Sequence, residues 1–287
     1  FILLRFLFYT VPVSAKTIRV PQDYPTIQAA INAAKKGDII QVSAEIYYEN
    51  VVINKEIKLM GANKDTTIID GKQSGNVIYV ETSGITITGF TIRNGNNGIR
   101  VMSTIGSINI TGNIIRNNRY GISLIGDEIT PTTGNIIVGN TFQNNSNVSV
   151  SFKSSLSNII SLNDISGSAY GIKLSATDTT TISKNFLSSN SYSIHITYGT
   201  GNNVLNNTGI DNSFGIYALY SDDLLVRDNR VSGSTYGIEL YGSYSSTILY
   251  NNVSDNPSYS IYLAYSNTTS VTNNTMSRND WGLTLYN

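Results

Sequence analysis

The chain has 287 residues, of which 40 % are hydrophobic and only 13 % charged, and its 19 basic and 19 acidic side chains give a net charge of zero. A neutral chain has no basic field to attract nucleic acid, so we expect no nucleic-acid partner. With no Cys, one His and three Met, it cannot form disulfides, iron–sulfur clusters, Cys-based zinc sites or His-rich metal sites.

The first fifteen residues have the features of a truncated secretory signal. Residues 1–13 are apolar except for Arg5, and Val13-Ser14-Ala15 is the kind of small-residue pattern that signal peptidase cleaves. The alternative is a buried or swapped N-terminal strand. No other stretch is long and apolar enough to span a bilayer. We therefore expect the remainder of the chain to be secreted, periplasmic or displayed on the cell surface.

Residues 16–38 are expected to form an N-terminal cap built around one helix. The apolar residues of the segment 26–36 fall on one helical face, Pro25 precedes the segment, and Gly37 follows it as a C-cap. A helix in this place would cover the open end of a repeat structure, which otherwise exposes unpaired strand edges.

A four-residue phrase recurs along the rest of the chain at intervals of 22–26 residues. It consists of a small residue, an aliphatic residue, any residue and a second aliphatic residue. The phrases are Gly98–Val101, Gly121–Leu124, Asn147–Val150, Gly171–Leu174, Ser193–Ile196, Gly215–Ala218, Gly237–Leu240, Ser260–Leu263 and Gly282–Leu285.

Two further columns share this period. One contains Asn113, Asn140, Asn163, Asn185, Asn207, Asn229, Asn252 and Asn274. The other contains Tyr120, Tyr170, Tyr192, Phe214, Tyr236, Tyr259 and Trp281. We expect the first column to form a buried asparagine ladder at a turn and the second to form an aromatic stack.

Short strands separated by Asn and Gly at this period are typical of an all-β, right-handed parallel β-helix, which we expect over residues 39–287. Each residue would then lie about 4.8 Å above its equivalent in the preceding coil. The two aliphatic residues of each phrase would point inward, and the residue between them outward. Because the last phrase ends two residues before the C-terminus, we expect further coils beyond it.

The N-terminal part resembles the signature of the pectin-lyase-like superfamily. The matching segments are Tyr24–Ile31, Gly37–Ile40, Tyr48–Val51 and Lys58–Gly61. Within that superfamily the chain is most similar to NosD-like periplasmic proteins and to β-helix repeat proteins of archaeal and bacterial surfaces. The resemblance covers residue 16 onward and implies the fold. It does not imply an activity, because the superfamily includes esterases, lyases, hydrolases, epimerases and proteins with no known chemistry.

The enzyme signatures of that superfamily are missing. The Gly-His-Gly phrase of polygalacturonases, the Gln-Asp-Thr phrase of pectin methylesterases and the Asp-Pro-His phrase of epimerases do not occur. Copper delivery, which the NosD resemblance implies, would need several His or Met ligands, whereas the chain has one His and the scattered Met60, Met102 and Met276. We expect no metal site of this kind.

Titratable and aromatic residues are densest in the outward column of the phrases. This column reads Arg100, Ser123, Ser149, Lys173, His195, Tyr217, Glu239, Tyr262 and Thr284, beside a second outward column of Ser175, Thr197, Leu219, Tyr241, Ala264 and Tyr286. Lys173, His195, Tyr217 and Glu239 are the candidate catalytic residues, since a base near a carboxylate could abstract the proton α to a uronate carboxyl. Tyr241, Tyr262 and Tyr286 are candidates for stacking on sugar rings. The alternative is a solvated sheet face with no ligand.

Four aspartates near loops, Asp178, Asp222, Asp223 and Asp228, could bind Ca²⁺, although ordinary turns also explain them. The leading hypothesis is an exported, non-catalytic β-helix domain that acts as a rigid scaffold or carbohydrate-binding surface. The alternative is a polysaccharide lyase or glycoside hydrolase that acts on an acidic polysaccharide along the face from Lys173 to Glu239. The expected partners are extracellular glycans or other surface proteins, and the chain is expected to be a monomer.

Overall fold

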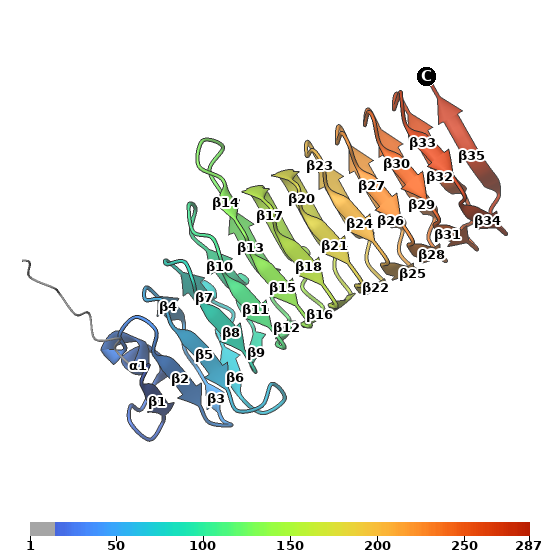
Figure 1. Ribbon diagram of the computed structural model, residues 1–287. Coiled ribbons are helices and arrows are strands. Elements are labelled where there is room, and N and C mark those ends of the chain that lie inside the picture. The colour runs from blue at the N-terminus through green and yellow to red at the C-terminus, as the bar shows by residue number, and fades with distance from the viewer. Residues whose placement is uncertain (1–14) are drawn as a thin grey trace, which may run out of the picture.

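The structure is a computed structural model that describes residues 15–287. Apart from Ala15, the expected signal segment therefore lies outside the described residues. The chain winds into a solenoid of three parallel sheets, with one short helix at its N-terminal end and strand β35 at its C-terminal end (Figure 1). The predicted right-handed parallel β-helix of about 22 residues per coil is confirmed.

Each coil contributes one strand to each sheet, and all the strand pairs are parallel. Sheet A contains, in spatial order, β1 (Thr17–Val20), β2 (Ile39–Val42), β5 (Lys58–Gly61), β8 (Thr86–Thr88), β11 (Asn109–Thr111), β15 (Ile136–Val138), β18 (Ile159–Ser161), β21 (Thr181–Ser183), β24 (Asn203–Leu205), β27 (Leu225–Arg227), β30 (Thr247–Leu249) and β33 (Ser270–Thr272). Sheet B contains β3 (Ile46–Tyr47), β6 (Ile68–Asp70), β9 (Thr91–Arg93), β12 (Ile114–Arg116), β16 (Thr141–Gln143), β19 (Asp164–Ser166), β22 (Phe186–Ser188), β25 (Thr208–Ile210), β28 (Arg230–Ser232), β31 (Asn252–Ser254) and β34 (Thr275–Ser277).

Sheet C has the longest strands and contains the repeated phrases. Its strands are β4 (Val51–Ile53), β7 (Asn76–Val80), β10 (Asn97–Val101), β13 (Tyr120–Ile125), β17 (Val148–Leu156), β20 (Tyr170–Asp178), β23 (Tyr192–Thr197), β26 (Phe214–Leu219), β29 (Tyr236–Tyr241), β32 (Tyr259–Ala264) and β35 (Trp281–Tyr286), with β14 (Thr132–Thr133) pairing beside β17. Sheet C is therefore the broadest continuous surface of the solenoid.

The helix α1 (Ile27–Ala33) covers the first coil, as predicted, and packs on β1, β2 and β4. Thr26 caps its N-terminus, and the Glu49 carboxylate accepts hydrogen bonds from the backbone N–H groups of residues 27 and 28 at 3.0 Å. The helix ends at Ala33, three residues earlier than expected. The Asp38 carboxylate holds the following turn instead, accepting from the backbone N–H groups of Lys16 and Lys35 at 2.8 Å, so Gly37 is not the C-cap.

The inward aliphatic side chains of the phrases form one core that runs the length of the solenoid. In the phrases from Gly98 to Leu263, apart from Asn147–Val150, the middle residue is more exposed than its two neighbours, as predicted; β29, for example, buries Ile238 and Leu240 but not Glu239. In the last phrase, Gly282–Leu285, both leucines are exposed and Thr284 is less exposed than either. One phrase was assigned wrongly. Strand β13 pairs with β17 so that Ser123 lies beside Ser151 rather than Ser149. Ser149 occupies the small-residue position, points inward and is fully buried.

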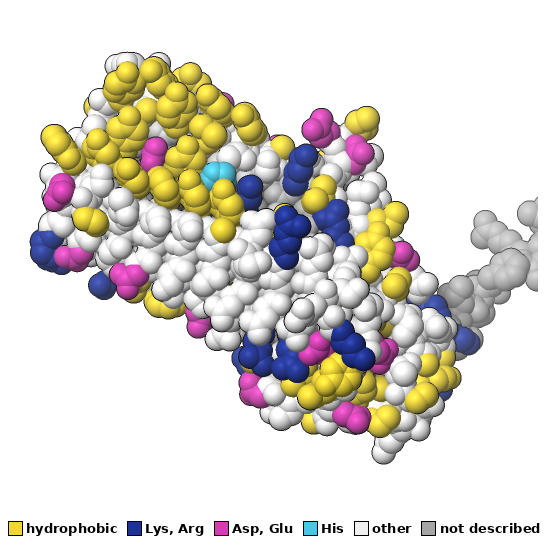
Figure 2. Space-filling model, turned by 180° about the vertical axis from the view of Figure 1, so that it is seen from behind, with side chains coloured by type: hydrophobic (Ala, Val, Ile, Leu, Met, Phe, Trp, Pro, Cys, Tyr) yellow, Lys and Arg dark blue, Asp and Glu magenta, His cyan; other side chains and the backbone are white. Residues whose placement is uncertain are grey.

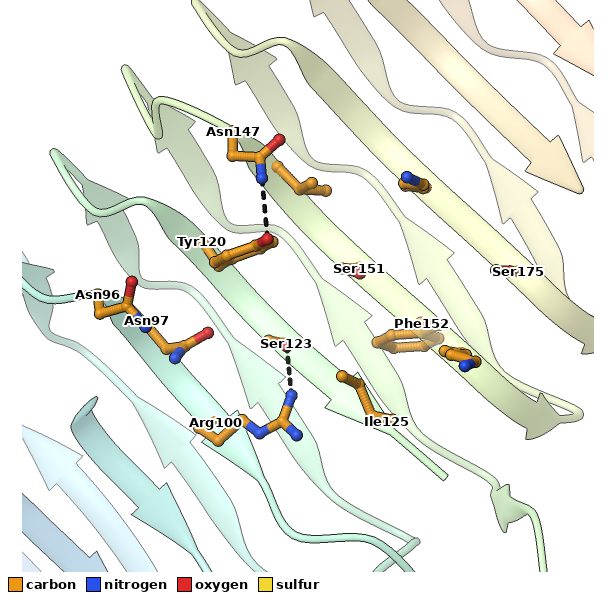
Figure 3. A pocket seen from close by; sticks show the side chains of 13 residues that line it. Asn96, Asn97, Arg100, Tyr120, Ser123, Ile125, Asn147, Ser151, Phe152 and Ser175 are labelled. Carbon is orange, nitrogen blue, oxygen red and sulfur yellow. Dashed lines mark hydrogen bonds between the residues drawn. The ribbon is translucent and has the colours of Figure 1, made fainter. Parts of the chain in front are cut away.

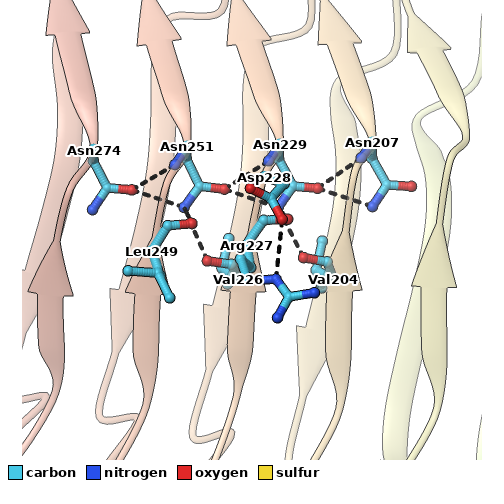
Figure 4. Close-up of polar contacts among 9 residues, drawn as sticks. All are labelled: Val204, Asn207, Val226, Arg227, Asp228, Asn229, Leu249, Asn251 and Asn274. Carbon is cyan, nitrogen blue, oxygen red and sulfur yellow. Dashed lines mark hydrogen bonds and ion pairs between the residues drawn. The ribbon is translucent and has the colours of Figure 1, made fainter.

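The predicted asparagine ladder is present at the turn that follows sheet A (Figure 4). The side-chain amide of each member donates to the next at 2.9–3.2 Å, from Asn113 through Asn140, Asn163, Asn185, Asn207, Asn229 and Asn251 to Asn274. The assignment of Asn252 was wrong, because Asn251 is the ladder residue and Asn252 is exposed in β31. Parts of a second ladder, such as Asn256 to Asn279, occur at the turn after sheet B.

No helix within residues 15–287 is long and apolar enough to cross a membrane.

Candidate functional site

The outer face of sheet C brings the predicted site residues together. Lys173 pairs in register with His195, His195 with Tyr217, Tyr217 with Glu239, and Glu239 with Tyr262. The order of the predicted row is therefore confirmed. His195 and Glu239 are two coils apart, which corresponds to about 10 Å at the usual strand spacing.

The second outward column is in the predicted register but is less uniform. Tyr241 and Tyr286 lie on the surface, each edge-on to Tyr265 at centroid distances of 5.3 and 5.4 Å. Thr197 and Ala264, in contrast, are buried. The three predicted stacking tyrosines are thus on one face, but only Tyr262 belongs to the row of Glu239.

The aromatic stack runs beside this row and is shorter than predicted. Tyr170, Tyr192, Phe214 and Tyr236 stack nearly parallel at 4.5–4.9 Å between ring centroids. Tyr120 is not part of the stack, because Val148 lies between Tyr120 and Tyr170 in the register of sheet C. The faces of the stacked rings cover one another, so this part of the column mainly stabilises the coils.

The two middle residues of the row, His195 and Tyr217, are uncharged at neutral pH. Burial and the Lys173 ammonium lower the pKa of His195 from 6.5 to about 4, so the imidazole is neutral at pH 7. Its ring stacks on Tyr217 at 5.2 Å, and its Nδ1 is buried without a hydrogen-bond partner among the described residues. Burial raises the pKa of the Tyr217 phenol and of the Glu239 carboxyl. Tyr217 is therefore a protonated phenol, and it cannot serve as a base at neutral pH.

A hollow of about 440 Å³ opens on the same face next to Lys173, and it has a simple structural cause. In strand β17, Val148 occupies the position of the aromatic column and Ser151 the outward position of the phrase. In the next strand of sheet C, β20, Tyr170 and Lys173 occupy these positions. Short side chains between long ones leave a depression in the sheet surface. We call this depression the basic hollow, and its residues are Asn96, Asn97, Arg100, Tyr120, Ser123, Ile125, Asn147, Val148, Ser151, Phe152, Lys153, Lys173 and Ser175.

The polar groups of the basic hollow converge from four coils (Figure 3). Arg100 donates from Nη1 to the Ser123 hydroxyl at 2.7 Å, and Asn147 donates to the Tyr120 hydroxyl at 2.9 Å. The Lys173 ammonium lies 4.6 Å from the centroid of the Tyr170 ring. Three basic residues line the hollow, no acidic residue does, and none of the three forms an ion pair within residues 15–287.

The basic hollow was not predicted from the sequence. Arg100 and Lys173 were placed in the outward column, but the two-residue error at Ser149 hid Ser151 and Lys153, which complete the hollow. One signal was present, since the alternating segment 148–152 fits the phrase in two registers and only one of them places Phe152 inward beside Leu124.

The outer face of sheet C thus divides into a basic half and an aromatic half. Figure 2 shows a wide hydrophobic area with the only histidine at its border and basic side chains beyond it. The arrangement can bind an extended ligand that carries negative charge at one end and offers apolar ring faces at the other.

The comparison with protein families identifies this architecture. The family model for the periplasmic copper-binding protein NosD matches residues 31–214, and the model for the right-handed β-helix region matches residues 157–287. The chain belongs to the NosD family. Its fold is that of the pectin-lyase-like superfamily, as the sequence resemblance indicated. The comparison with curated proteins found no match.

Several solved structures share the fold at low sequence identity. A structure of XylC with xylose has a TM-score of 0.69 and 14 % identity, and the match covers 80 % of this chain and 66 % of XylC. The A-module of a mannuronan C-5 epimerase of Azotobacter vinelandii has a TM-score of 0.65 at 14 % identity, with 91 % and 92 % of the two chains covered. An alginate lyase of Paenibacillus sp. FPU-7 has a TM-score of 0.62 at 14 % identity, with 95 % and 98 % covered.

The residues of this NosD-family chain do not fit a copper site. Met60 lies on sheet A, Met276 on sheet B and Met102 directly after a strand of sheet C, so the soft ligands do not converge. The single histidine is mostly buried among aromatic rings. Within residues 15–287, no group of three or more His, Cys, Asp or Glu side chains is arranged to hold a metal ion.

The aspartates considered for Ca²⁺ are engaged in turns. Asp178 and Asp222 accept hydrogen bonds from the backbone N–H groups of residues 200 and 244 at 2.7 and 2.8 Å, and Asp228 pairs with Arg227 at 3.0 Å. These contacts support the interpretation of the three aspartates as turn residues.

Proposed function

We propose that this NosD-family chain is an exported, non-catalytic β-helix domain that binds an acidic polysaccharide on the outer face of sheet C. The observation that carries the proposal is the basic hollow, where Arg100, Lys153 and Lys173 converge with hydroxyl and amide groups and no acidic residue is present. Carboxylates or sulfates of a glycan would pair with the three basic groups, and sugar hydroxyls with the polar lining. The description of the family as periplasmic supports an exported location.

The shape of the surface supports a polymer as the ligand. The basic hollow and the row from Lys173 to Glu239 lie on consecutive strands of one sheet, so an extended chain could follow the solenoid axis across both. The structural relatives include an alginate lyase and a mannuronan epimerase, whose names refer to acidic polysaccharides. At this level of identity they support the fold, and the ligand class rests on the basic hollow.

The geometry favours binding over catalysis. General acid–base catalysis needs groups within hydrogen-bond reach that exchange protons near the working pH. The neutral His195, with a pKa of about 4, is a weak base, and none of residues 15–287 forms a hydrogen bond that orients its buried Nδ1. The protonated Tyr217 lies between it and Glu239. The row of four titratable residues on adjacent strands is nevertheless the observation that supports a lyase or hydrolase as the second candidate.

One experiment separates the two candidates. Polygalacturonate, alginate, hyaluronan and neutral xylan would be tested for retardation of the protein in affinity electrophoresis, and the same mixtures would be assayed for unsaturated products and new reducing ends. We expect retardation by an acidic polymer, none by xylan, and no products.

The variants make the test specific. The double variant Lys153→Gln/Lys173→Gln should lose most of the retardation, whereas Arg230→Gln, which removes an exposed positive charge from sheet B, should not. Turnover that disappears in His195→Ala or Glu239→Ala would replace the binding proposal with the catalytic one. Absence of retardation by every acidic polymer would contradict it.

A further inference from the structure

The aromatic stack loosens around Glu239. Its centroid spacing is 4.5–4.9 Å up to Tyr236, then widens to 6.0 Å between Tyr236 and Tyr259 and to 6.3 Å between Tyr259 and Trp281. Between Tyr236 and Tyr259 the wider spacing coincides with a break in the backbone pairing, since the pairing of β29 with β32 begins only at Ile238 and does not include these two residues. Ring faces that are covered elsewhere in the stack are therefore partly free at this position.

A cavity of about 280 Å³ fills this gap, open to the surface and lined by Phe214, Tyr236, Glu239, Tyr259 and Tyr262. We call these five residues the Glu239 cage. Four of them are aromatic, and the fifth is the only charged group. Tyr217 and Tyr262 flank Glu239 in its own row, so aromatic side chains surround the carboxylate on the neighbouring strands as well.

The Glu239 carboxylate has no positive partner among residues 15–287. Within the part of the chain that the structure describes, it forms no ion pair, and only its burial shifts the pKa of the carboxyl, with no nearby cation contributing. The cationic group of its row, Lys173, is three coils away, which corresponds to about 14 Å at the usual strand spacing. A half-buried carboxylate without a counter-charge is costly, so a bound cation would relieve an existing penalty.

We propose that the Glu239 cage binds an organic ammonium group, such as that of a quaternary amine or an amino sugar. Aromatic ring faces attract cations through their quadrupole, and a carboxylate at the base of the cage adds a direct ion pair. A metal ion would find only one hard ligand in the cage, whereas an ammonium group with an apolar surface matches both the rings and the charge. The site lies apart from the basic hollow and goes beyond the proposed polysaccharide binding.

The test uses isothermal titration of the whole chain at pH 7, where both amines are mainly charged, with two pairs of probes. Choline is compared with dimethylbutanol, its uncharged carbon isostere, and glucosamine is compared with N-acetylglucosamine. We expect at least one charged probe to bind about tenfold or more tightly than its uncharged counterpart. The two pairs distinguish a quaternary amine from an amino sugar as the source of the ammonium group.

Variants of the cage test the assignment. Glu239→Gln should weaken binding of the charged probe about tenfold, Tyr262→Ala should weaken it as well, and Tyr262→Phe should retain it because the ring face, not the hydroxyl, makes the contact. Tyr250→Ala, an exposed tyrosine at a turn outside sheet C, is the matched control and should bind like the parent. Unchanged circular dichroism spectra would show that each variant is folded.

Two outcomes would overturn the proposal: no preference for either charged probe over its uncharged counterpart, or equal binding by the parent and Glu239→Gln. The double variant Lys153→Gln/Lys173→Gln should bind the cation normally. Failure of polysaccharide binding at the basic hollow and failure of cation binding at the cage are therefore distinguishable.

Discussion

At the scale of single residues, asparagine side chains pair the buried polar atoms at the turns of the solenoid. Each ladder Asn accepts from the backbone N–H and the side-chain amide of its predecessor and donates to a buried carbonyl, so polar turn atoms inside the solenoid are paired. If the column repeated a charged residue in place of asparagine, like charges would lie about 4.8 Å apart in neighbouring coils and would repel each other. Avoidance of stacked like charges is therefore a physical reason for the low charge content of the chain.

Asn251 and Asn252 form a matched pair for testing the ladder. Asn251→Leu would remove the acceptor of the Asn229 backbone N–H, one of the three acceptors of the Asn229 side-chain amide and a donor to the Val226 carbonyl. A buried N–H without a partner costs about 1–3 kcal/mol. We expect a loss of about 1–3 kcal/mol in the free energy of unfolding, measured by urea denaturation. Asn252→Leu should change it little, because the Asn252 side chain is exposed. Equal effects of the two substitutions would contradict the observed register.

His195 gives a residue-scale prediction about pH. As pH falls, the unfolded chain binds a proton near the usual pKa of 6.5, whereas the folded chain does so only near 4. The contribution of His195 to stability is therefore complete above pH 6.5 and is lost as pH falls towards 4. Glu239 acts with the opposite sign, because its raised pKa makes the folded chain take up its proton first.

The single histidine allows this shift to be measured directly. In a nuclear magnetic resonance titration, the imidazole signals of the folded chain should titrate near pH 4. The stability difference between the parent and His195→Phe should move against the parent between pH 6.5 and 4. A midpoint near 6.5 would show that the ring is exposed and that it is not buried between Lys173 and Tyr217.

At the scale of elements, the repeated phrase specifies the strand and the direction of its side chains. Its small first residue also marks where neighbouring coils approach closely: a Cβ on Gly237 would collide with the Val253 side chain and the Ser260 carbonyl. The small residue is thus required by packing. The aromatic column adds a second, outer line of contacts along sheet C.

Phe214 tests the aromatic column. It stacks on Tyr192 at 4.5 Å and on Tyr236 at 4.7 Å. Phe214→Ala would remove both contacts and the apolar area of the ring, and we expect it to lower the free energy of unfolding by about 1–3 kcal/mol in urea denaturation. Phe214→Tyr is the control and should be close to neutral, since tyrosine holds the same position in the neighbouring coils. An unchanged stability of Phe214→Ala would show that the stack is incidental.

The sequence predicted the register of a strand correctly where the repeated phrase fitted in one way only. It predicted the wrong register where the phrase or the ladder fitted in two ways. In sheet C the phrases from Gly171 onward recur every 22 or 23 residues, and their register was predicted correctly. At 147–152 small and apolar residues alternate over a longer strand, so two registers satisfy the phrase and only the contact of Phe152 with the core decides between them. Asn251 and Asn252 posed the same problem, because two adjacent asparagines both fit a ladder.

The candidate site was predictable in part for the same reason. The row from Lys173 to Glu239 follows from the period alone, and its order was predicted. The basic hollow forms because the short side chains of Val148 and Ser151 stand where other coils have long ones. The Glu239 cage forms because the ring spacing widens after Tyr236. Such gaps arise from three-dimensional packing, and a sequence period does not report them.

At the scale of the whole molecule, two sites with unpaired charges lie on one face of a chain with zero net charge. Of the three sheets, sheet C carries both the basic hollow and the isolated Glu239, at opposite ends of one row. The rigid spacing of the coils fixes the distance between these sites. A glycan with acidic and amino groups could occupy both, whereas a purely acidic one would occupy only the basic hollow.

The most direct test of the central claim is the dissociation constant of an acidic oligosaccharide, measured by isothermal titration over a series of salt concentrations. The ligand is the acidic polymer that retards the parent, cut to oligosaccharides, and the proteins are the parent and the triple variant Arg100→Gln/Lys153→Gln/Lys173→Gln. We predict binding by the parent that weakens steeply with salt, and binding by the variant that is at least about tenfold weaker and nearly independent of salt. Equal affinity and equal salt dependence in the two proteins would contradict the account.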